Sequence, residues 1–359
     1  MPARIEEWRR QVRDSATTAA GLRRLTAIPE LQVAELDRTD LSFAWRVTPY
    51  YAGLMDPLDR SCPIRLQALP DPREAEDPVG TPDSLDEQSR SPAPNLVQVY
   101  PDRVAWMVST TCPVLCRHCQ RKWLVGRERR DMSGEARAET LRYIRSTPAI
   151  RDVLLTGGDP LMHDDRYIEG ILRELRAIPH VEIIRIGTRM PCTLPQRITD
   201  GLCAMLRRYH PIWLNTQFNH PRELTPDARR ACARLVDAGI PVGNQSVLLR
   251  GVNDDAAVMR SLVQGLVGMR VRPYYLFQAQ TVAGTAHFRA PIEKGIEIIR
   301  SLRGFTSGIA VPRYVLDTPY GKVPLEPSAV VRRSASAVWV RAYDGRIWKE
   351  PNPREQRTG

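Results

Sequence analysis

The sequence predicts an α/β protein: a partial (β/α)6, TIM-like barrel with a helical extension before it and a strand-rich segment after it. Six apolar stretches of strand character alternate with segments of helical periodicity between residues 104 and 305. A Pro-rich, acidic stretch precedes this alternation, and strand patterns follow it. Strands that alternate with helices favour a parallel sheet, so a barrel or partial barrel is expected, with an open doubly wound sheet as the competing architecture.

The first 103 residues are predicted to form an N-terminal helical region followed by an extended connection. Residues 1–60 carry helical patterns and short turns, whereas residues 65–103 are rich in Pro, Asp, Glu and Ser, a composition that disfavours regular structure. The N-terminus is charged and lacks the apolar core of a signal peptide, and no run of about 18 apolar residues predicts a membrane span. A cytoplasmic location is therefore expected.

Six predicted strands define the barrel region, residues 104–305. They are residues 104–110, 152–158, 181–189, 211–219, 240–249 and 272–280. Each strand ends in a polar or Gly-rich cluster, and strand ends of this kind form the active face of α/β barrels. Residues 306–359 are predicted to form a C-terminal strand segment, with one strand at residues 309–318 and a hairpin that turns around Asp344 and Gly345.

The net charge indicates which partners to expect, and the cysteine count indicates whether the chain works in a reducing or an oxidising compartment. The 359 residues carry a formal net charge of +11, but Arg is scattered and the densest basic patch, residues 121–130, is short. Most of the excess positive charge is interpreted as a solvated, Arg-rich surface, so neither nucleic acid nor a membrane is an expected partner. Seven cysteines in a chain of this size favour a reducing compartment and metal-binding or catalytic thiols over disulfides.

Three cysteines, Cys112, Cys116 and Cys119, lie in CPVLCRHC directly after the first predicted strand. A structural zinc site usually has four ligands, often on two paired arms, and only one arm is present here. A [4Fe–4S] cluster held by three thiolates leaves one iron open to a substrate or cofactor. Three unrelated buried thiols, or zinc with a distant fourth ligand, are the alternatives. The spacing resembles that of radical S-adenosylmethionine (SAM) enzymes, which implies that the open iron binds the methionine part of SAM.

A Gly-Gly-Asp turn, formed by Gly157, Gly158 and Asp159, ends the second predicted strand. Glycine allows the backbone to approach a ligand closely, and the carboxylate can accept a hydrogen bond from an ammonium group. Most turns of this composition are only tight turns. Because it lies one strand after the cysteine loop, this turn resembles the motif that holds the methionine amino group in radical SAM enzymes.

Longer stretches of the chain resemble lysine 2,3-aminomutase, a family that couples SAM radical chemistry to pyridoxal 5′-phosphate (PLP). They include CRHCQRKWLVG (116–126), HPIWLNTQFNHP (210–221), GIPVGNQSVLLRGVND (239–254) and VPRYVLDTPYGKVP (311–324). The resemblance covers nearly the whole chain, starting with WRRQVRD (8–14) near the N-terminus. It implies a radical SAM barrel that uses a [4Fe–4S] cluster, SAM and PLP, with the PLP lysine in the C-terminal strand segment.

The resemblance implies that Lys322, in DTPYGKVP, is the lysine that binds PLP covalently. Considered alone, a Lys beside Gly in a loop is usually only solvated. An amine that attacks an aldehyde needs a depressed pKa and a flexible tether, and Gly321 gives freedom of approach. Tyr100 and Arg103 are implied to hold the cofactor phosphate. The Arg that the family often has just before this Tyr is Val99 here, so fewer charges would bind the phosphate.

The residues that the resemblance assigns to the substrate differ in part from those of the lysine enzyme. Arg121 matches the arginine that binds the substrate α-carboxylate, a task for which a planar guanidinium is suited. Of the two aspartates that bind the distal ammonium in the family, one aligns with Asp317 and the other with Gln280. Gln217, which replaces a His of the family, and Gln245 are assigned to the cofactor site. The polar end of the substrate pocket has therefore changed.

The zinc cysteines of the family are missing from this chain. The tail KEPNPREQRTG has none, and Asp255 stands where one is expected, so no zinc is predicted. The expected partners are a small amino-acid substrate, an external electron donor such as flavodoxin or ferredoxin, and a second copy of the chain in a homodimer.

The resemblance implies an isomerase that removes a side-chain hydrogen atom from a free basic amino acid and moves the amino group from carbon 2 to carbon 3. Arginine is the first candidate substrate, because a guanidinium can bridge one carboxylate and one amide, and lysine is the second. A radical at carbon 4 cannot reach the nitrogen, so a desaturase, for example an arginine 4,5-desaturase, is the alternative. The alternative of another class is radical SAM modification of RNA or of a protein-bound lysine.

Overall fold

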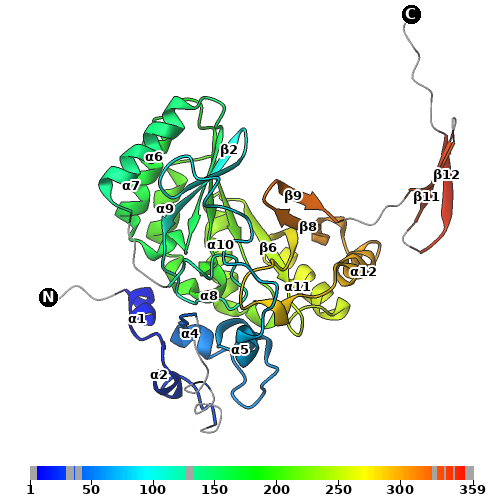
Figure 1. The fold of residues 1–359 in the computed structure, drawn as a ribbon, viewed down its shortest axis with the longest axis horizontal. Coiled ribbons are helices and arrows are strands. Elements are labelled where there is room, and N and C mark those ends of the chain that lie inside the picture. Colours follow the sequence, from blue (N-terminus) through cyan, green and yellow to red (C-terminus); the bar gives the residue numbers. More distant parts are fainter. Residues whose placement is uncertain are drawn as a thin grey trace, which may run out of the picture.

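A nine-stranded sheet forms the centre of the protein in a computed structural model, which describes residues 6–29, 36, 43–126, 132–325, 330–334, 337–342 and 344–351 (Figure 1). The strands are β1 (Leu96–Tyr100), β2 (Arg103–Ser109), β3 (Asp152–Gly157), β4 (Ile183–Gly187), β5 (Ile212–Thr216), β6 (Val242–Leu248), β7 (Arg272–Gln278), β8 (Arg313–Thr318) and β9 (Gly321–Pro324). The end of the basic patch (127–130) and the tail after residue 351 lie outside the described residues.

The strands follow one another in chain order, and those from β2 to β8 are parallel. β1 pairs antiparallel with β2 at one edge of the sheet, and β9 pairs antiparallel with β8 at the other. The two edge strands do not pair with each other in this strand order, so the sheet is a partial barrel. The boundary between β1 and β9 is called the seam below. The predicted α/β partial barrel is confirmed, and its six predicted strands are β2 to β7.

Helices follow the parallel strands and cover the outer face of the sheet (Figure 1). They are α6 (Gly134–Ser146), α7 (Asp165–Arg176), α9 (Asp200–Arg207), α10 (Pro226–Asp237), α11 (Ala256–Gly268) and α12 (Ile292–Leu302), with a short α8 (Met190–Thr193) after β4. α7 is typical, because Ile168, Ile171, Leu172 and Leu175 are buried at the spacing of one helical face. Asp255, which stands at the expected zinc position, is the N-cap of α11 and accepts from two backbone amides of its first turn.

Burial alternates along the strands and separates an outer face from an inner face. In β6, Val242 and Leu248 are buried, whereas Gln245 and Val247 are half-buried. Half-buried positions on other strands contact residues of the predicted site, as Thr156 of β3 does with Arg121. The half-buried positions therefore face the interior of the barrel, where the predicted site lies.

The chain before the barrel consists of short helices and an irregular connection. The helices are α1 (Glu7–Arg13), α2 (Ala19–Arg23), α4 (Pro49–Ala52) and α5 (Pro63–Ala68), which gather at one end of the barrel (Figure 1). The connection has one short 3-10 helix, Pro72–Ala75, and then leads into β1, a strand that the sequence analysis did not predict. Two carboxylates of this connection, Glu74 and Glu87, form ion pairs with residues of the cysteine loop.

The C-terminal strands are divided between two sheets. The predicted strand at residues 309–318 is β8, which joins the barrel sheet beside β7. A separate three-stranded sheet contains β10 (Val330–Arg333), β11 (Ala337–Arg341) and β12 (Ile347–Pro351), and β11 and β12 form the predicted antiparallel pair on either side of Asp344 and Gly345. The three-part domain division stays a prediction. Within the described ranges, none of the helices has the length and apolar character needed to span a membrane.

Candidate active site

The cysteine loop follows β2 at the carboxyl-terminal edge of the parallel sheet. Cys112, Cys116 and Cys119 are half-buried there and form no disulfide, whereas the other four cysteines of the chain are buried. The loop turns tightly, because the amide of Cys119 donates to the carbonyl oxygen of Cys116 at 3.1 Å. The three predicted cluster ligands therefore share one loop, and all three remain partly accessible.

The spacing of the thiols on this loop suits an iron–sulfur cluster. Among the described residues, no three His, Cys, Asp or Glu side chains converge as the ligands of one ion do. A cubane cluster takes one thiolate at each iron, so its ligands need not converge on one point. Burial raises the pKa of Cys112 and raises that of Cys119 to about 11, so these groups must lose protons when iron binds.

Gly157 and Gly158 allow the end of β3 to pack against the cysteine loop. Gly157 has a φ of +122°, and a Cβ atom there would collide with the carbonyl oxygen of Ser109. A Cβ atom on Gly158 would lie 2.5 Å from the carbonyl oxygen of Thr111. These glycines therefore permit close contact between two chain segments, a reason that the sequence analysis did not give. Their predicted role toward SAM stays a prediction.

Asp159 is buried, and its carboxylate is hydrogen-bonded within the fold. Oδ1 accepts from the hydroxyl of Thr188 at 2.7 Å and from the amide of Leu161 at 3.0 Å, and Oδ2 accepts from the amide of Arg189 at 2.9 Å. Burial raises the pKa of Asp159 despite these donors. The carboxylate thus connects the ends of β3 and β4, and its predicted contact with the SAM ammonium stays a prediction.

Lys322 lies on the β8–β9 hairpin, directly across from Asp317 in the antiparallel pair. Its Nζ is 3.1 Å from Oδ2 of Asp317 and 5.6 Å from the centroid of the Phe277 ring on β7. The side chain is 32% exposed, so a ligand can reach the amine from solvent. The hairpin therefore presents an amine beside a carboxylate and an aromatic face at the mouth of the barrel.

Tyr100 joins the two edges of the sheet across the seam. Its hydroxyl accepts a hydrogen bond from the backbone amide of Lys322 at 2.7 Å. Gly321 has a φ of +111°, and a Cβ atom there would lie 2.7 Å from the Tyr100 hydroxyl, so only glycine fits. The guanidinium of Arg103 stacks on the Tyr100 ring at 3.6 Å and pairs with Asp102 at 2.8 Å. The two residues predicted to hold the PLP phosphate are thus adjacent to the predicted PLP lysine.

Arg121 is buried, and Glu87 holds its guanidinium. Nε and Nη2 donate to the two oxygens of Glu87 at 2.8 and 2.5 Å, and Nη1 donates to the hydroxyl of Thr156 at 3.3 Å. These bonds occupy the Nε edge of the guanidinium and leave N–H groups on the Nη1–Nη2 edge for a carboxylate. Burial opposes the charged form, but Glu87 and then Cys119 and Asp317 raise the pKa of Arg121. Asp317 is therefore within electrostatic range of Arg121.

Gln280 and Asp317 lie together at the ends of β7 and β8. The Gln280 side-chain amide donates to the backbone carbonyl of Asp317 at 3.1 Å, while the Asp317 carboxylate pairs with Lys322. The structure thus brings together the two residues predicted to bind the distal end of the substrate. Their assignment to the substrate stays a prediction.

Comparison with known proteins identifies the family of this chain. The family model for the radical SAM superfamily matches residues 106–262, and the model for lysine-2,3-aminomutase matches residues 299–359. The L-lysine 2,3-aminomutase of Fusobacterium nucleatum is 47% identical over 350 residues, which cover 97% of this chain and 82% of the relative. The chain belongs to the lysine 2,3-aminomutase family. This membership implies a [4Fe–4S] cluster and SAM.

Other members of the lysine 2,3-aminomutase family are almost as similar but differ in the amino acid that they are named for. The L-lysine 2,3-aminomutase of Clostridium subterminale is 46% identical, over 97% of this chain and 84% of the relative. The glutamate 2,3-aminomutase of Clostridioides difficile is 41% identical, over 96% of this chain and 83% of the relative. Among solved structures, a radical SAM methyltransferase from Sphaerobacter thermophilus aligns with 61% of this chain and 68% of its own at 20% identity and a TM-score of 0.44.

In this family member, Arg189 is a site residue that the sequence analysis missed. It is buried after β4 and donates to Sγ of Cys116 at 2.7 Å, to Oε1 of Gln67 at 2.6 Å and to Oε1 of Glu223 at 2.8 Å. Arg189 therefore connects the predicted cluster ligand to a buried polar network. These three partners lie 34 to 122 positions away along the chain, so no local motif could reveal them.

His118 was noticed only as part of the cysteine motif, yet it contacts Gln217, a predicted cofactor residue. The amides of Gln217 and Asn219 donate to its Nε2 from 3.0 and 3.3 Å. Burial, together with the charges of Arg189 and Lys122, lowers the pKa of His118 well below its ordinary value, so the ring is neutral. Nδ1 then carries the proton, and it is buried without a partner among the described residues, so it is available as a donor to a ligand.

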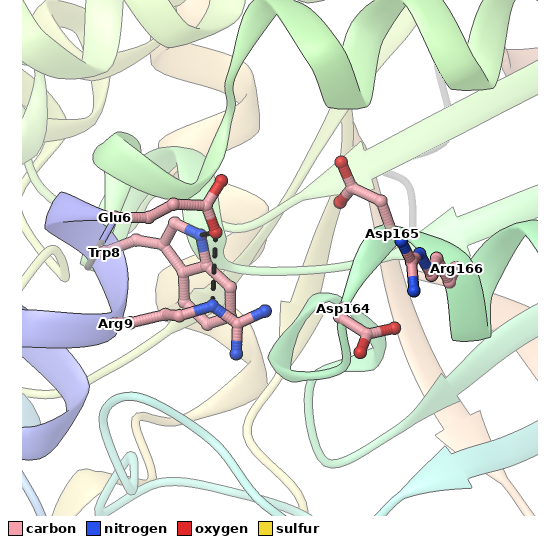
Figure 2. Close-up of a pocket in the computed structure, with 6 residues that line it drawn as sticks. All are labelled: Glu6, Trp8, Arg9, Asp164, Asp165 and Arg166. Atoms are coloured by element: carbon pink, nitrogen blue, oxygen red, sulfur yellow. Dashed lines mark hydrogen bonds and ion pairs between the residues drawn. The ribbon is translucent and has the colours of Figure 1, made fainter. Parts of the chain in front are cut away.

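A separate pocket between α1 and the start of α7 contains none of the predicted site residues (Figure 2). It is lined by Glu6, Trp8, Arg9, Asp164, Asp165 and Arg166. On one wall, Glu6 accepts from the Trp8 indole at 2.9 Å and pairs with Arg9 at 3.2 Å. On the other wall, Asp165 pairs with Arg197 at 2.7 Å. These charges satisfy one another, so the pocket is assigned no role.

Proposed function

We propose that this member of the lysine 2,3-aminomutase family is a radical SAM, PLP-dependent enzyme that moves the 2-amino group of a free basic L-amino acid to carbon 3. The observation that carries the proposal is the grouping of Arg121, Asp317 and Lys322. A guanidinium, a carboxylate and an accessible amine match the α-carboxylate of the substrate, its distal cation and the aldehyde of PLP. Asp317 is 3.1 Å from the Lys322 amine and affects the pKa of Arg121.

When bound, the reduced cluster and SAM supply a 5′-deoxyadenosyl radical, and PLP supplies a conjugated ring that stabilises a neighbouring radical. Cys112, Cys116 and Cys119 would hold the cluster. Gly157, Gly158 and Asp159 at the end of β3, together with Gln217 and Gln245, would contact SAM. Tyr100, Arg103 and Lys322 would hold PLP.

Arg121 orients the substrate in this proposal. Its Nε edge is fixed by Glu87, which prevents rotation of the guanidinium and presents the Nη1–Nη2 edge in one direction. A substrate carboxylate that binds this edge receives two charge-assisted hydrogen bonds. Because position decides which hydrogen atom is removed, the rigid pairing of Arg121 with Glu87 supports a reaction at one defined carbon.

Asp317 favours a basic substrate over an acidic one. Its carboxylate pairs with the Lys322 amine, and it becomes available to another cation when that amine is used to bind PLP. A carboxylate-bearing side chain, such as that of glutamate, would face like charge there. Gln280 adds an amide beside Asp317, and an amide with one carboxylate suits the dispersed charge of a guanidinium, so arginine ranks first and lysine second.

The test is an anaerobic reaction of reconstituted, reduced protein with SAM, PLP and a panel containing arginine, lysine, glutamate and alanine, followed by mass spectrometry. A β-amino isomer of arginine or lysine, with deoxyadenosine in catalytic traces only, is the expected result. Deoxyadenosine formed in step with a product two mass units lighter would instead define a desaturase. Turnover of glutamate or alanine alone, or of RNA or a protein lysine alone, would overturn the proposal. An external electron donor and a homodimer stay expectations.

A further inference from the structure

The seam carries a cation that the proposed function has not used, and the inference drawn from it rests on the PLP binding proposed above. Arg90 lies on the connection before β1, and its backbone carbonyl accepts a hydrogen bond from the amide of Gln98 at 2.9 Å. Its guanidinium lies over the Tyr320 ring, 5.4 Å from the centroid. Tyr320 is two residues before Lys322, so Arg90 reaches across the seam from the β1 side to the hairpin.

Apart from the Tyr320 ring, the Arg90 guanidinium has no hydrogen-bond or ion-pair partner within the described part of the chain. Its Nε is buried without a hydrogen bond, and no carboxylate of a described residue pairs with it. Leaving a buried donor unpaired is unfavourable, and the penalty is larger for a charged group. The nearby arginines differ in this respect, because Arg103 pairs with Asp102 and Arg121 pairs with Glu87. The positive charge of Arg90 at the seam is therefore available to an external anion.

We infer that Arg90 binds the phosphate of PLP and supplies the positive charge that Val99 cannot. A phosphate monoester carries nearly two negative charges at neutral pH, and a guanidinium binds its oxygens through paired N–H groups. Tyr100 fixes the location, because it bonds to Lys322 and carries the stacked Arg103. The charge of Arg103 is already compensated by Asp102, whereas no carboxylate of a described residue pairs with Arg90.

The Tyr320 ring positions this cation. Tyr320 is 89% exposed, which is unusual for an aromatic side chain and shows that its ring does not stabilise the core. Its face attracts the guanidinium through a cation–π contact, which holds Arg90 at the seam before the ligand arrives. The contact uses the ring and not the hydroxyl, so Tyr320→Phe should bind PLP as the wild type does, whereas Tyr320→Leu should bind it more weakly.

The test compares PLP with pyridoxal, which has the aldehyde but no phosphate. Apoprotein is titrated with each compound, and binding is followed by the visible absorbance that develops when the aldehyde reacts with a protein lysine. Arg90→Gln should weaken PLP binding about tenfold to a hundredfold, the scale of a charge-assisted hydrogen bond, and leave pyridoxal binding unchanged. Arg90→Lys should recover part of the loss. The readout is a dissociation constant and does not require the radical reaction.

Arg332→Gln is the matched control. Arg332 also lies over an aromatic ring, 4.7 Å from the centroid of Trp339, but in the separate C-terminal sheet. This variant should bind both compounds as the wild type does. Loss of an arginine stacked on a ring therefore cannot by itself explain an effect seen only in Arg90→Gln.

The outcomes separate this inference from the proposed function. If borohydride reduction of the wild type with PLP labels no peptide that contains Lys322, the proposed PLP site fails. If the wild type is labelled at Lys322 but Arg90→Gln binds PLP with the wild-type constant, the inference about Arg90 is overturned while the PLP site stands. Equal weakening of PLP and pyridoxal would also overturn it, because Arg90 would then support the hairpin and not the phosphate.

Discussion

The two sides of the barrel mouth are built differently. On the cysteine-loop side, buried charges are paired within the fold: Arg117 and Lys122 share Glu74, and Arg189 pairs with Glu223. On the hairpin side, Lys322 is partly exposed and Arg90 has no ion-pair partner among the described residues.

The cysteine-loop side is therefore ordered before ligands bind, whereas the hairpin side has a charge, that of Arg90, that only a bound ligand would compensate. A network of buried, paired charges is rigid, and it fits cofactors that every radical SAM enzyme shares. A partly exposed hairpin with uncompensated charge beside it is suited to bind the substrate, which differs among the named relatives. Of the positions expected to depart from the family, Val99 and Gln280 lie on the hairpin side, whereas Gln217 contacts His118 of the cysteine loop.

The largest expected effect concerns the cysteine loop. Replacing Cys112, Cys116 or Cys119 by Ala should remove the iron of the cluster and abolish deoxyadenosine formation, because each thiolate holds one iron. Iron analysis and anaerobic product detection measure both effects. Cys203→Ala and Cys232→Ala are the controls, since these thiols are buried in α9 and α10 and have a packing role. Deoxyadenosine formation by any of the three loop variants would contradict the cluster assignment.

Lys322→Ala should affect the hairpin side alone. The variant should lose the visible absorbance of lysine-bound PLP and retain the iron–sulfur spectrum, because the cysteine loop contains its own network of contacts. Borohydride reduction and peptide mass spectrometry identify the labelled residue. A label on a different lysine in the variant would show that the anchor has been assigned wrongly.

Arg189→Met tests whether the cysteine-loop side depends on its internal pairing. The change leaves Glu223 buried without its cation, so the free energy of unfolding should fall by about 3–5 kcal/mol. Urea unfolding measures the difference. Arg151→Met is the matched control, because Arg151 forms an exposed pair with Glu182 and its loss should change stability little. Equal effects of the two substitutions would refute the idea of a preorganised buried network.

The smallest expected effect concerns Gln280 on the hairpin side and the choice between lysine and arginine. Gln280→Asp should favour lysine over arginine by about 1–3 kcal/mol in relative turnover, because a compact ammonium depends more on full negative charge than a guanidinium does. Competition assays on the wild type and the variant give the ratio. Asp317→Ala should reduce turnover of both substrates. An unchanged ratio in Gln280→Asp would mean that Gln280 does not contact the substrate.

Local pattern was sufficient to predict the barrel strands and the candidate ligands in the cysteine loop. Each of the six strands is an apolar run bounded by polar or glycine residues, and the three candidate thiols fall within one short stretch, CPVLCRHC. β1 was missed because its five residues, Leu96–Tyr100, follow a long Pro-rich stretch and have no helix after them. Their strand conformation depends on pairing with β2.

Residues whose roles depend on distant partners could not be predicted. Glu87 lies in a segment of low regularity, and only the fold shows that it holds Arg121, 34 positions away. Arg189 likewise meets Cys116 across 73 positions. The glycines at the end of β3 were found from the sequence, but their close contact with the backbone of the neighbouring loop was not. Long-range pairing of charges is not encoded in a local motif.

The bond between the Tyr100 hydroxyl and the Lys322 amide has a thermodynamic consequence for the whole barrel. The chain segment that is proposed to carry PLP also joins the two edges of the sheet. If PLP binds only when the seam is closed, PLP binding stabilises the closed seam. A ligand at 100 times its dissociation constant stabilises the closed form by about 2.7 kcal/mol. Hydrogen exchange at the Lys322 amide should therefore slow when PLP is added, even though PLP does not bond to that amide, and the apoprotein should open first at this edge.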